Sequence, residues 1–312
     1  MREIIISPGE AGGRFDKYLG KYLRQASRSF LYKMLRKKNI TLNGAKADGS
    51  EILQSGDHIK LFFSDETLEK FTAGADKASG IPRIDLDIIY EDDDVIFINK
   101  PAGMLSQKAR PEDISLCEYL AAYLADRRGD AADGRKVFSP GVCNRLDRNT
   151  SGLITAGKTL RGLQSLSEAF RERKADKYYL AIVRGELSQN TGFDGYLTKD
   201  AASNTVSLGT DGSSGGEHVS TEIYPLDTKG GYSLVRVKLL TGKTHQIRAT
   251  MQYLGYPIVG DKKYGAADLS RARRQLLHSY ELVFKDTGER FIAAPPKDFT
   301  DTAALLGLSM GE

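Results

Sequence analysis

The sequence has few cysteines and no long hydrophobic run. Cys117 and Cys143 are the only cysteines among its 312 residues, too few for the disulfide framework of a small secreted protein. No stretch approaches the roughly 20 apolar residues of a membrane-spanning helix. The three isoleucines at residues 4–6 precede Pro8, and such a run is too short for the core of a signal peptide. We therefore expect a cytoplasmic protein with no membrane partner.

Clustered metal ligands and a nucleotide-binding loop are missing from the sequence as well. The four histidines, His58, His218, His245 and His278, are widely spaced, and the two cysteines are not paired at ligand spacing. A zinc site usually draws its ligands from short sequence clusters. No glycine-rich phosphate loop of the Walker type occurs. We expect that the protein uses neither a metal nor a cofactor.

Positive charge is concentrated in the first fifth of the chain. Residues 1–63 contain 12 Lys and Arg residues against 6 Asp and Glu, a net charge of +6. The remaining residues contain 33 basic and 35 acidic side chains, a net charge of −2. Such asymmetry suggests a polyanion-binding module attached to a second part of different character. A well-solvated surface explains the same charge distribution equally well.

The chain divides into two domains joined by a polar segment. In residues 1–63, two short stretches have apolar residues at helical spacing, Ser27 is suited to cap the second helix, and Asn43–Gly44 is typical of a tight turn. Residues 64–82 are polar, contain glycine and end in a proline, as linkers often do. Residues 83–312 then form the larger domain.

Strand patterns outnumber helix patterns in the larger domain. Residues 203–217 are rich in glycine and serine, which indicates a hairpin or a mobile loop. Because strands and helices do not alternate regularly, the pattern favours an α+β fold with a mainly antiparallel mixed sheet over a doubly wound fold. We predict strands at 95–99, 153–155, 178–183 and 232–240, and helices at 114–127, 160–173 and 244–254.

The most distinctive stretch, residues 144–152, is a polar, turn-prone loop that leads into an apolar strand. In it Asp147 lies between Arg145 and Arg148. Nearby cations favour an ionised carboxylate, so Asp147 is suited to act as a nucleophile or a base. A structural ion pair explains this charge pattern too, and charge alone favours that explanation.

The loop resembles the catalytic motif of the RluA-type pseudouridine synthases, Arg-Leu-Asp-x-x-Thr-Ser-Gly. Five further segments are similar to motifs of this family and follow in the family's order, which makes the resemblance far more specific than one motif would. In this sequence the six segments are 100–103 (KPAG), 145–152 (RLDRNTSG), 177–181 (KYYLA), 241–248 (TGKTHQIR), 260–265 (GDKKYG) and 277–278 (LH).

The first domain has a resemblance of its own. Residues 14–19 (RFDKYL), 27–29 (SRS), 42–44 (LNG) and 56–57 (GD) are similar to an RNA-binding domain of the ribosomal protein S-four type. That domain precedes the catalytic domain in many enzymes of the family. The resemblance implies that the first domain binds RNA through its basic side chains, for which the candidates are Arg14, Arg28, Lys33, Arg36, Lys37 and Lys38.

The resemblance implies an isomerase that converts uridine to pseudouridine within RNA without a cofactor. By analogy with the family, Asp147 starts the reaction, either by attacking the sugar or by removing a sugar proton. Arg248 matches the arginine that pairs with the aspartate, and Tyr179 the tyrosine that stacks on the base. The target uridine must be turned out of its stack to reach the site. Arg145 and Arg148 either contact RNA or form structural salt bridges.

Two positions depart from the family pattern. Asn144 stands where the family usually has histidine, and asparagine cannot titrate near neutral pH. An acid–base role for this position is therefore in doubt. Lys243 stands where arginine is common, which keeps the charge but loses the planar guanidinium.

The RNA target is a separate question. A domain of the S-four type favours large-subunit (23S) ribosomal RNA, with transfer RNA as the alternative, and we expect the protein to act as a monomer.

Two other functions are alternatives to an RNA-modifying enzyme. One is a non-catalytic RNA-binding protein with a degenerate synthase domain. A glycoside hydrolase is another, because glycosidic bonds are also broken by carboxylates, but that chemistry normally needs two. The sequence does not show that Asp261, the other motif carboxylate, faces Asp147.

Overall fold

The computed structural model describes residues 1–72, 81–127, 139–200, 205–212, 215–265 and 272–310. The first part of the chain forms a four-stranded sheet with strand order β1-β4-β2-β3. Its strands are β1 (Arg2–Ile5), β2 (Ile40–Leu42), β3 (Ala45–Lys46) and β4 (His58–Leu61), and its helices are α1 (Phe15–Tyr22), α2 (Arg28–Arg36) and α3 (Asp65–Thr72).

Local signals in the sequence explain the elements of this first unit. Ser27 caps α2, as predicted, by accepting a hydrogen bond from the backbone N–H of Phe30. Asn43 and Gly44 both have positive φ angles and form the tight turn between β2 and β3, the conformation that an Asn-Gly pair favours. Phe15, Leu19 and Leu35 are buried in one cluster, so the apolar stripes of both helices face one core.

The predicted linker, residues 64–82, is wrong at its beginning, because α3 (Asp65–Thr72) lies there. Leu68 is buried in the core of the first unit, the ring centroids of Phe71 and Phe30 are 4.7 Å apart, and Gln25 donates its backbone N–H to the carbonyl of Phe71. Residues 65–72 therefore belong to the first unit, although their sequence is mostly polar. Residues 73–80 of the predicted linker lie outside the described residues.

The second part of the chain is built on an 11-stranded sheet with the order β11-β10-β12-β13-β9-β14-β8-β6-β5, to which β15 and β7 add at β14 and β8. The described pairings are antiparallel except that of β8 with β14. This confirms the predicted α+β fold with a mainly antiparallel mixed sheet. The strands are β5 (Ile88–Glu91), β6 (Val95–Lys100), β7 (Gly141–Val142), β8 (Ser151–Gly157), β9 (Ala175–Arg184), β10 (Thr191–Asp200), β11 (Thr205–Gly209), β12 (Glu217–Lys229), β13 (Tyr232–Leu239), β14 (Leu277–Phe284) and β15 (Arg290–Ile292).

Helices cover both faces of this sheet. They are α4 (Leu116–Arg127), α5 (Leu160–Arg171), α6 (Gln246–Tyr253) and α7 (Lys297–Leu305). Each helix and strand predicted for this domain is present, with ends shifted by a few residues. In the predicted hairpin, β11 pairs with β10, and residues 201–204 and 213–214 lie outside the described residues.

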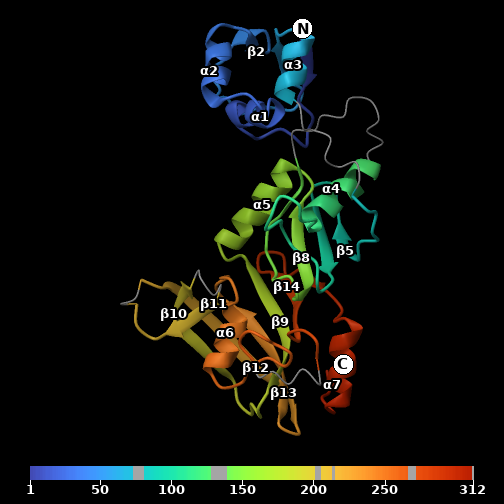
Figure 1. The fold of residues 1–312 in the computed structure, drawn as a ribbon, viewed down its shortest axis with the longest axis vertical. Coiled ribbons are helices and arrows are strands. Elements are labelled where there is room, and N and C mark those ends of the chain that lie inside the picture. Colours follow the sequence, from blue (N-terminus) through green and yellow to red (C-terminus); the bar gives the residue numbers. More distant parts are fainter. Residues whose placement is uncertain (73–80, 128–138, 201–204, 213–214, 266–271, 311–312) are drawn as a thin grey trace.

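Strand β9 separates two hydrophobic layers, because alternate side chains of a strand point to opposite faces. Tyr179 and Ala181 pack with Ile247 of α6, whereas Leu180 packs with Phe299 of α7. The side chain of Tyr179 therefore points to the face that α6 covers. Figure 1 shows α6 and α7 well apart from each other, with β9 between them in this view.

The two units meet at the beginning of α5. The backbone N–H of Leu160 donates to the carbonyl of Gly9 over 3.1 Å, and Figure 1 shows the first unit next to the beginning of α5. A cavity of about 400 Å³ at this junction is lined by residues that include Arg14, Lys17 and Lys21.

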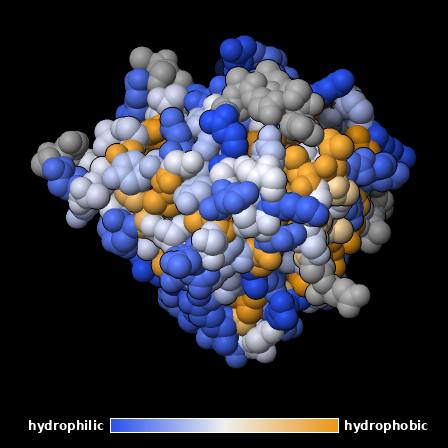
Figure 2. Space-filling model, turned by 90° about the horizontal axis from the view of Figure 1, so that it is seen from below, coloured by the Kyte–Doolittle hydropathy of each residue, from blue (hydrophilic) through white to orange (hydrophobic). Residues whose placement is uncertain are grey.

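At the opposite end of the molecule, hydrophobic surface residues occur in patches among hydrophilic ones (Figure 2). None of the described helices is both long and apolar enough to span a membrane.

Candidate active site

The loop that carries Asp147 is fixed by the segment that follows β6. Gly103 donates its backbone N–H to the carbonyl of Arg148 over 2.8 Å, and the Arg148 guanidinium donates to the carbonyl of Gly103 over 3.0 Å. Ser106 Oγ donates to the carbonyl of Leu146 and accepts from its N–H, over 2.8 and 3.1 Å. The backbone on both sides of Asp147 is thereby held, while its side chain stays 24% exposed.

A buried lysine completes the support of this loop. The Nζ of Lys100, at the end of β6, donates to the carbonyl oxygens of Pro101, Met104 and Arg148, over 2.8, 2.9 and 3.2 Å. Burial, and to a smaller extent the charge of Arg274, lower the pKa of Lys100 to about 7, while the charge of Asp147 acts in the opposite direction. Lys100 thus ties the segment 100–104 to the Asp147 loop.

Arg248 lies between two carboxylates. Its Nη1 donates to Oδ2 of Asp147 over 2.8 Å. Its Nε and Nη2 donate to the two carboxylate oxygens of Asp261 over 2.7 and 2.9 Å. The planar guanidinium has the geometry for such a two-point contact. Arg248 therefore contacts Asp147 while its position is set by Asp261, a residue 0% exposed.

The electrostatics of this triad follow from burial and pairing. Burial alone would raise the pKa of Asp261, but hydrogen bonds and charge from Arg248, together with the backbone N–H groups of Lys263 and Tyr264, lower it. Burial likewise opposes the charge of Arg248, and the two carboxylates outweigh it and raise the pKa of Arg248. The arginine is thus a permanent cation that contacts the Asp147 carboxylate at 2.8 Å.

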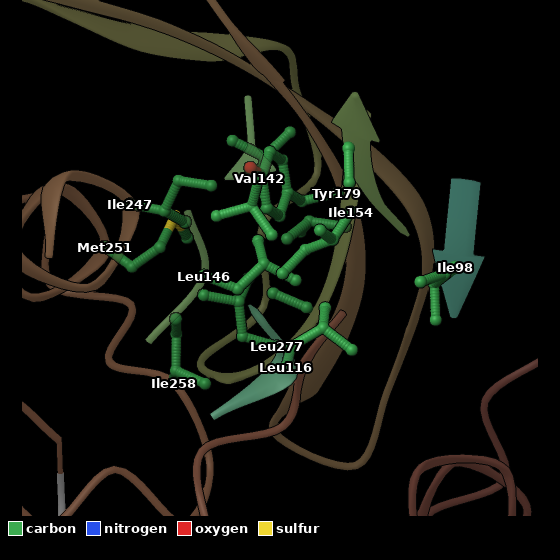
Figure 3. Close-up of a cluster of buried hydrophobic side chains, with 14 of the residues drawn as sticks. Ile98, Leu116, Val142, Leu146, Ile154, Tyr179, Ile247, Met251, Ile258 and Leu277 are labelled. Atoms are coloured by element: carbon green, nitrogen blue, oxygen red, sulfur yellow. The ribbon is translucent and has the colours of Figure 1, made fainter. Parts of the chain in front are cut away.

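Tyr179 reaches the same region from β9. Its side chain is buried against Leu146 on the Asp147 loop and Ile247 and Met251 of α6, as Figure 3 shows. Burial, together with the smaller effect of the Asp147 charge, raises the pKa of Tyr179 to about 12, while a hydrogen bond with Ser279 acts in the opposite direction. Tyr179 is therefore a neutral phenol within the electrostatic reach of Asp147, at the edge of a packed apolar cluster.

His245 is a site residue that the sequence analysis named only as one member of a motif. Its Nε2 lies 3.7 Å from Oδ2 of Asp147, and its Nδ1 lies 3.0 Å from the hydroxyl oxygen of Tyr264. The backbone of His245 is left-handed, with φ of 57°, at the residue before α6. The segment 241–248 therefore brings two charged or polar side chains, His245 and Arg248, to Asp147.

The two departures from the family motifs lie outside this group of contacts. Asn144 uses its side-chain amide on β8: Oδ1 accepts from the N–H and hydroxyl of Thr155, and Nδ2 donates to the carbonyl of Leu153. It anchors the loop to the strand, which asparagine does without titrating. Lys243 forms an ion pair with Glu217 at the surface.

The basic residues expected to contact RNA lie on exposed surface. Arg145 is exposed, and no hydrogen bond or ion pair within the described residues involves its guanidinium. In the first unit, Lys33, Arg36, Lys37 and Lys38 are exposed on α2 and directly after it. Two others are partly engaged by Asp16: Arg14 forms an ion pair at 3.0 Å, and Arg28 approaches it at 3.7 Å.

Sequence reasoning does not find Asp261, Lys100 and Tyr264 as members of the site. The sequence raises Asp261 only as a carboxylate that could face Asp147, whereas it lies on the other side of Arg248. All three belong to the motif segments 100–103 and 260–265, so the motifs do carry a signal. Among the described residues there is no group of three His, Cys, Asp or Glu side chains placed to hold a metal ion.

Comparison with known proteins relates this site to one family. Residues 94–253, which include Asp147, Tyr179 and Arg248, match the family described as RNA pseudouridylate synthase. Ribosomal large subunit pseudouridine synthase D of Borreliella burgdorferi is 31% identical over 96% of this chain and 90% of its own length. Ribosomal large subunit pseudouridine synthase C of Escherichia coli strain K12 is 28% identical over 96% of this chain and 93% of its own.

Two solved structures show the same fold. Human RNA Pseudouridylate Synthase Domain Containing 1 superimposes with a TM-score of 0.54 at 26% identity, over 69% of this chain and 84% of that chain. Human RNA Pseudouridylate Synthase Domain Containing 4 gives a TM-score of 0.59 at 20% identity, over 72% and 94%. The large mixed sheet and the helices on it are therefore an architecture shared with these proteins.

Proposed function

The chain belongs to the RNA pseudouridylate synthase family and isomerises uridine to pseudouridine in RNA, and from that premise we propose that its substrate is large-subunit ribosomal RNA and that Asp147 starts the reaction. The observation that carries the second proposal is the contact between Arg248 and the Asp147 carboxylate, at 2.8 Å. The first rests on the relatives named as acting on the large ribosomal subunit.

Asp147 is suited to this role by its combination of fixed backbone and available side chain. The cation of Arg248 holds the carboxylate by a charge-assisted hydrogen bond, and a carboxylate that is partly exposed remains free to meet a substrate. Breaking the bond between ribose carbon 1′ and the uracil nitrogen needs such a group, either as nucleophile at the sugar or as base. The base then turns within the site, and its carbon 5 is joined to carbon 1′.

Tyr179 is proposed to hold the uracil ring. Its aromatic side chain offers a flat apolar surface, and stacking on a base is worth roughly 1–3 kcal/mol in proteins that bind single-stranded nucleic acid. Because the pKa of Tyr179 is raised to about 12, the phenol stays protonated at neutral pH. Its hydroxyl can therefore donate a hydrogen bond and take part in proton transfer at carbon 5.

Entry of the uridine requires that it leave its stack, at a cost of about a few kcal/mol. Arg145 and Arg148 flank Asp147 on the exposed side of the loop, and we propose that Arg145 contacts the RNA near the extruded nucleotide. Arg148 is already engaged with the carbonyl of Gly103, so its main role is to support the loop.

The first unit is proposed to be an RNA-binding domain of the S-four type that adds affinity for the phosphate backbone. Its net charge of +6 and the exposed basic residues after Ser27 support this role. Arg14, Lys17 and Lys21 line the cavity at the junction with α5, so basic side chains continue from the first unit toward the catalytic unit. A ribosomal RNA substrate also fits the cytoplasmic setting expected from the cysteine content.

The RNA target is tested by mapping pseudouridine at single-nucleotide resolution in RNA from cells with and without the protein. We expect one or a few sites in large-subunit ribosomal RNA to disappear, and the purified protein to restore them in vitro. Loss of sites only in transfer RNA would replace the proposed target. Loss of no site at all, with no activity of the purified protein on either RNA, would contradict the proposal.

A further inference from the structure

His245 and Tyr264 form a hydrogen-bond chain that ends beside Asp147. The backbone N–H of Val206, on β11, donates to the Tyr264 hydroxyl oxygen over 2.7 Å. That oxygen lies 3.0 Å from Nδ1 of His245, and the other imidazole nitrogen lies 3.7 Å from Asp147. The chain therefore runs from the hairpin at the edge of the sheet to the catalytic carboxylate.

The direction of these hydrogen bonds fixes the tautomer of the imidazole. The Tyr264 oxygen accepts the Val206 hydrogen, and its own hydrogen needs an acceptor because the residue is buried. Among the described residues that hydroxyl has one acceptor within hydrogen-bond distance, Nδ1 of His245. A neutral imidazole that accepts at Nδ1 carries its hydrogen on Nε2. The N–H group of His245 therefore points toward Asp147.

Burial is the largest influence on the pKa of this ring, and it favours the neutral form. Burial lowers the pKa of His245, and Arg248 and Lys263 act in the same direction, whereas Asp147 and Asp261 act against it. The hydrogen bond from Tyr264 favours the neutral ring as well, since Nδ1 cannot accept a hydrogen bond when it is protonated.

The Nε2 hydrogen has no acceptor within the described residues. A separation of 3.7 Å from the Asp147 oxygen exceeds hydrogen-bond range, and Arg248 already donates to that oxygen. Catalytic hydrogen bonds are often long without substrate and tighten when it binds. A largely buried ring that presents an unfilled donor to a partly exposed site is arranged for a ligand atom.

We propose that His245 is a catalytic residue that donates its Nε2 hydrogen to a carbonyl oxygen of the target uracil, and that Tyr264 is the positioning residue that sets its tautomer. This inference rests on the proposed role of Asp147. Uracil oxygen 2 is attached to the carbon next to the nitrogen that carries the ribose. It therefore lies beside the sugar atoms on which Asp147 acts, within reach of a donor that sits near the carboxylate.

The hydrogen bond has a clear purpose in the reaction. When the bond between carbon 1′ and the uracil nitrogen breaks, its electron pair stays on the base and spreads over the ring nitrogen and the carbonyl oxygens. A donor already oriented toward one of these oxygens stabilises the charge as it develops. His245 transfers no proton, and it leaves the step in the protonation state in which it entered.

Nitrogen NMR of the full chain labelled at histidine tests the tautomer without any activity assay. The four histidines make the spectrum simple, and a His245→Asn variant assigns the relevant signals. We expect protonated Nε2 and unprotonated Nδ1 at neutral pH, and a mixture of both tautomers in Tyr264→Phe. A ring protonated at Nδ1, or at both nitrogens, in the native protein would overturn the proposal.

Two substitutions at His245 test the donor itself. Asparagine tolerates the left-handed backbone, and its oxygen can replace Nδ1 as the acceptor for Tyr264, but its side chain is too short to replace Nε2. Glutamine reaches farther. In single-turnover assays on the mapped RNA we expect His245→Asn to lower the rate about 100-fold, and His245→Gln to recover part of that loss. RNA affinity should change by less than about twofold.

His218→Ala is the matched control. His218 is an exposed histidine that contacts Asp194 on β10, and its loss should leave the rate unchanged. A native rate for His245→Asn, while Asp147→Asn is inactive, would refute the role of His245 and leave the role of Asp147 intact. A native protein that forms no pseudouridine would refute the proposed function instead, and the NMR result would still report the tautomer.

Discussion

The two carboxylates on either side of Arg248, Asp147 and Asp261, differ in exposure and in the number of hydrogen bonds that they accept. Asp261 is 0% exposed, and it accepts two hydrogen bonds from the guanidinium and two from backbone N–H groups. Asp147 is 24% exposed, and within the described residues its side chain accepts one hydrogen bond, from the same guanidinium. A fully satisfied carboxylate has no free lone pair for a substrate, whereas Asp147 has.

The same difference separates two histidines, His278 and His245. His278 is buried, and both ring nitrogens are within hydrogen-bond distance of protein oxygens, the hydroxyl of Ser151 and the carbonyl of Ala293. His245 has one nitrogen committed to Tyr264 and one turned toward the site. In each of these two pairs, one side chain has its hydrogen bonds filled, and the other has a hydrogen-bonding position left open toward the site.

The largest effect is expected for Asp147→Asn. Asparagine has nearly the same shape but can act neither as nucleophile nor as base, so pseudouridine formation should fall by more than about 1000-fold. The melting temperature and RNA affinity should stay near those of the native protein, because only one partly exposed ion pair is weakened. Single-turnover assays with thermal melting measure both. Substantial turnover in a pure preparation would remove Asp147 from the mechanism.

Asp261→Asn should affect stability and activity together. The neutral amide leaves the buried Arg248 with one charged partner, and breaking a buried ion pair typically destabilises a protein by about 3–5 kcal/mol. We expect a lower melting temperature of the catalytic unit, and a lower rate because Arg248 is no longer held. Asp147→Asn should lose activity without losing stability, whereas Asp261→Asn should lose both. If Asp261→Asn were inactive but as stable as the native protein, Asp261 would be a reacting group.

The sequence predicts Asp147 and Arg248 as members of the site, but it does not predict the residues that support them. The motif around Asp147 indicates the reacting residue, and Arg248 follows from a second motif. Asp261 and Tyr264 stay hidden as supports because their contacts join separate segments: Asp261 contacts Arg248 of α6 across 13 positions, and Tyr264 contacts Val206 across 58. Such pairings depend on how the strands are ordered in the sheet, which no local pattern specifies.

Helix α3 escapes sequence-based prediction for a related reason. Its sequence, DETLEKFT, is mostly polar and is followed by glycine-containing residues, so a linker is the simpler interpretation. Two apolar side chains, Leu68 and Phe71, are enough to dock it, because the core of the first unit offers them Phe30 and its neighbours. Tertiary contacts therefore decide the structure of a segment whose own pattern is weak.

A smaller effect, on the free energy of unfolding at acidic pH, is expected for His278. Burial lowers the pKa of His278 to about 4, below the ordinary value of 6.5. Between these values the unfolded chain binds a proton that the folded chain does not, so acidification through this window should destabilise the protein. The slope is at most about 1.4 kcal/mol per pH unit. Unfolding measured from pH 7 to pH 4 should show a weaker slope in His278→Gln than in the native protein; equal slopes would mean that His278 does not contribute.

The smallest effect per residue, on RNA affinity, is expected in the first unit. The question there is whether its exposed basic side chains bind RNA or are only solvated. Arg36, Lys37 and Lys38 are exposed after the buried stripe of α2. Replacing all three by glutamine should weaken RNA binding and flatten its salt dependence. The slope of log affinity against log salt should fall by roughly 0.7–0.9 for each phosphate that the substituted side chains no longer neutralise.

The control replaces three basic residues of the catalytic unit, Lys229, Lys285 and Lys297, in the same way. It changes the net charge equally and should leave the slope unchanged if the RNA-binding side chains lie in the first unit. Titrations of both variants with the mapped RNA at several salt concentrations measure the difference. A single-turnover rate at saturating protein should stay native in both, since neither set touches Asp147 or its supports. Equal slopes in the two variants would mean that net charge, and not a surface on the first unit, attracts the RNA.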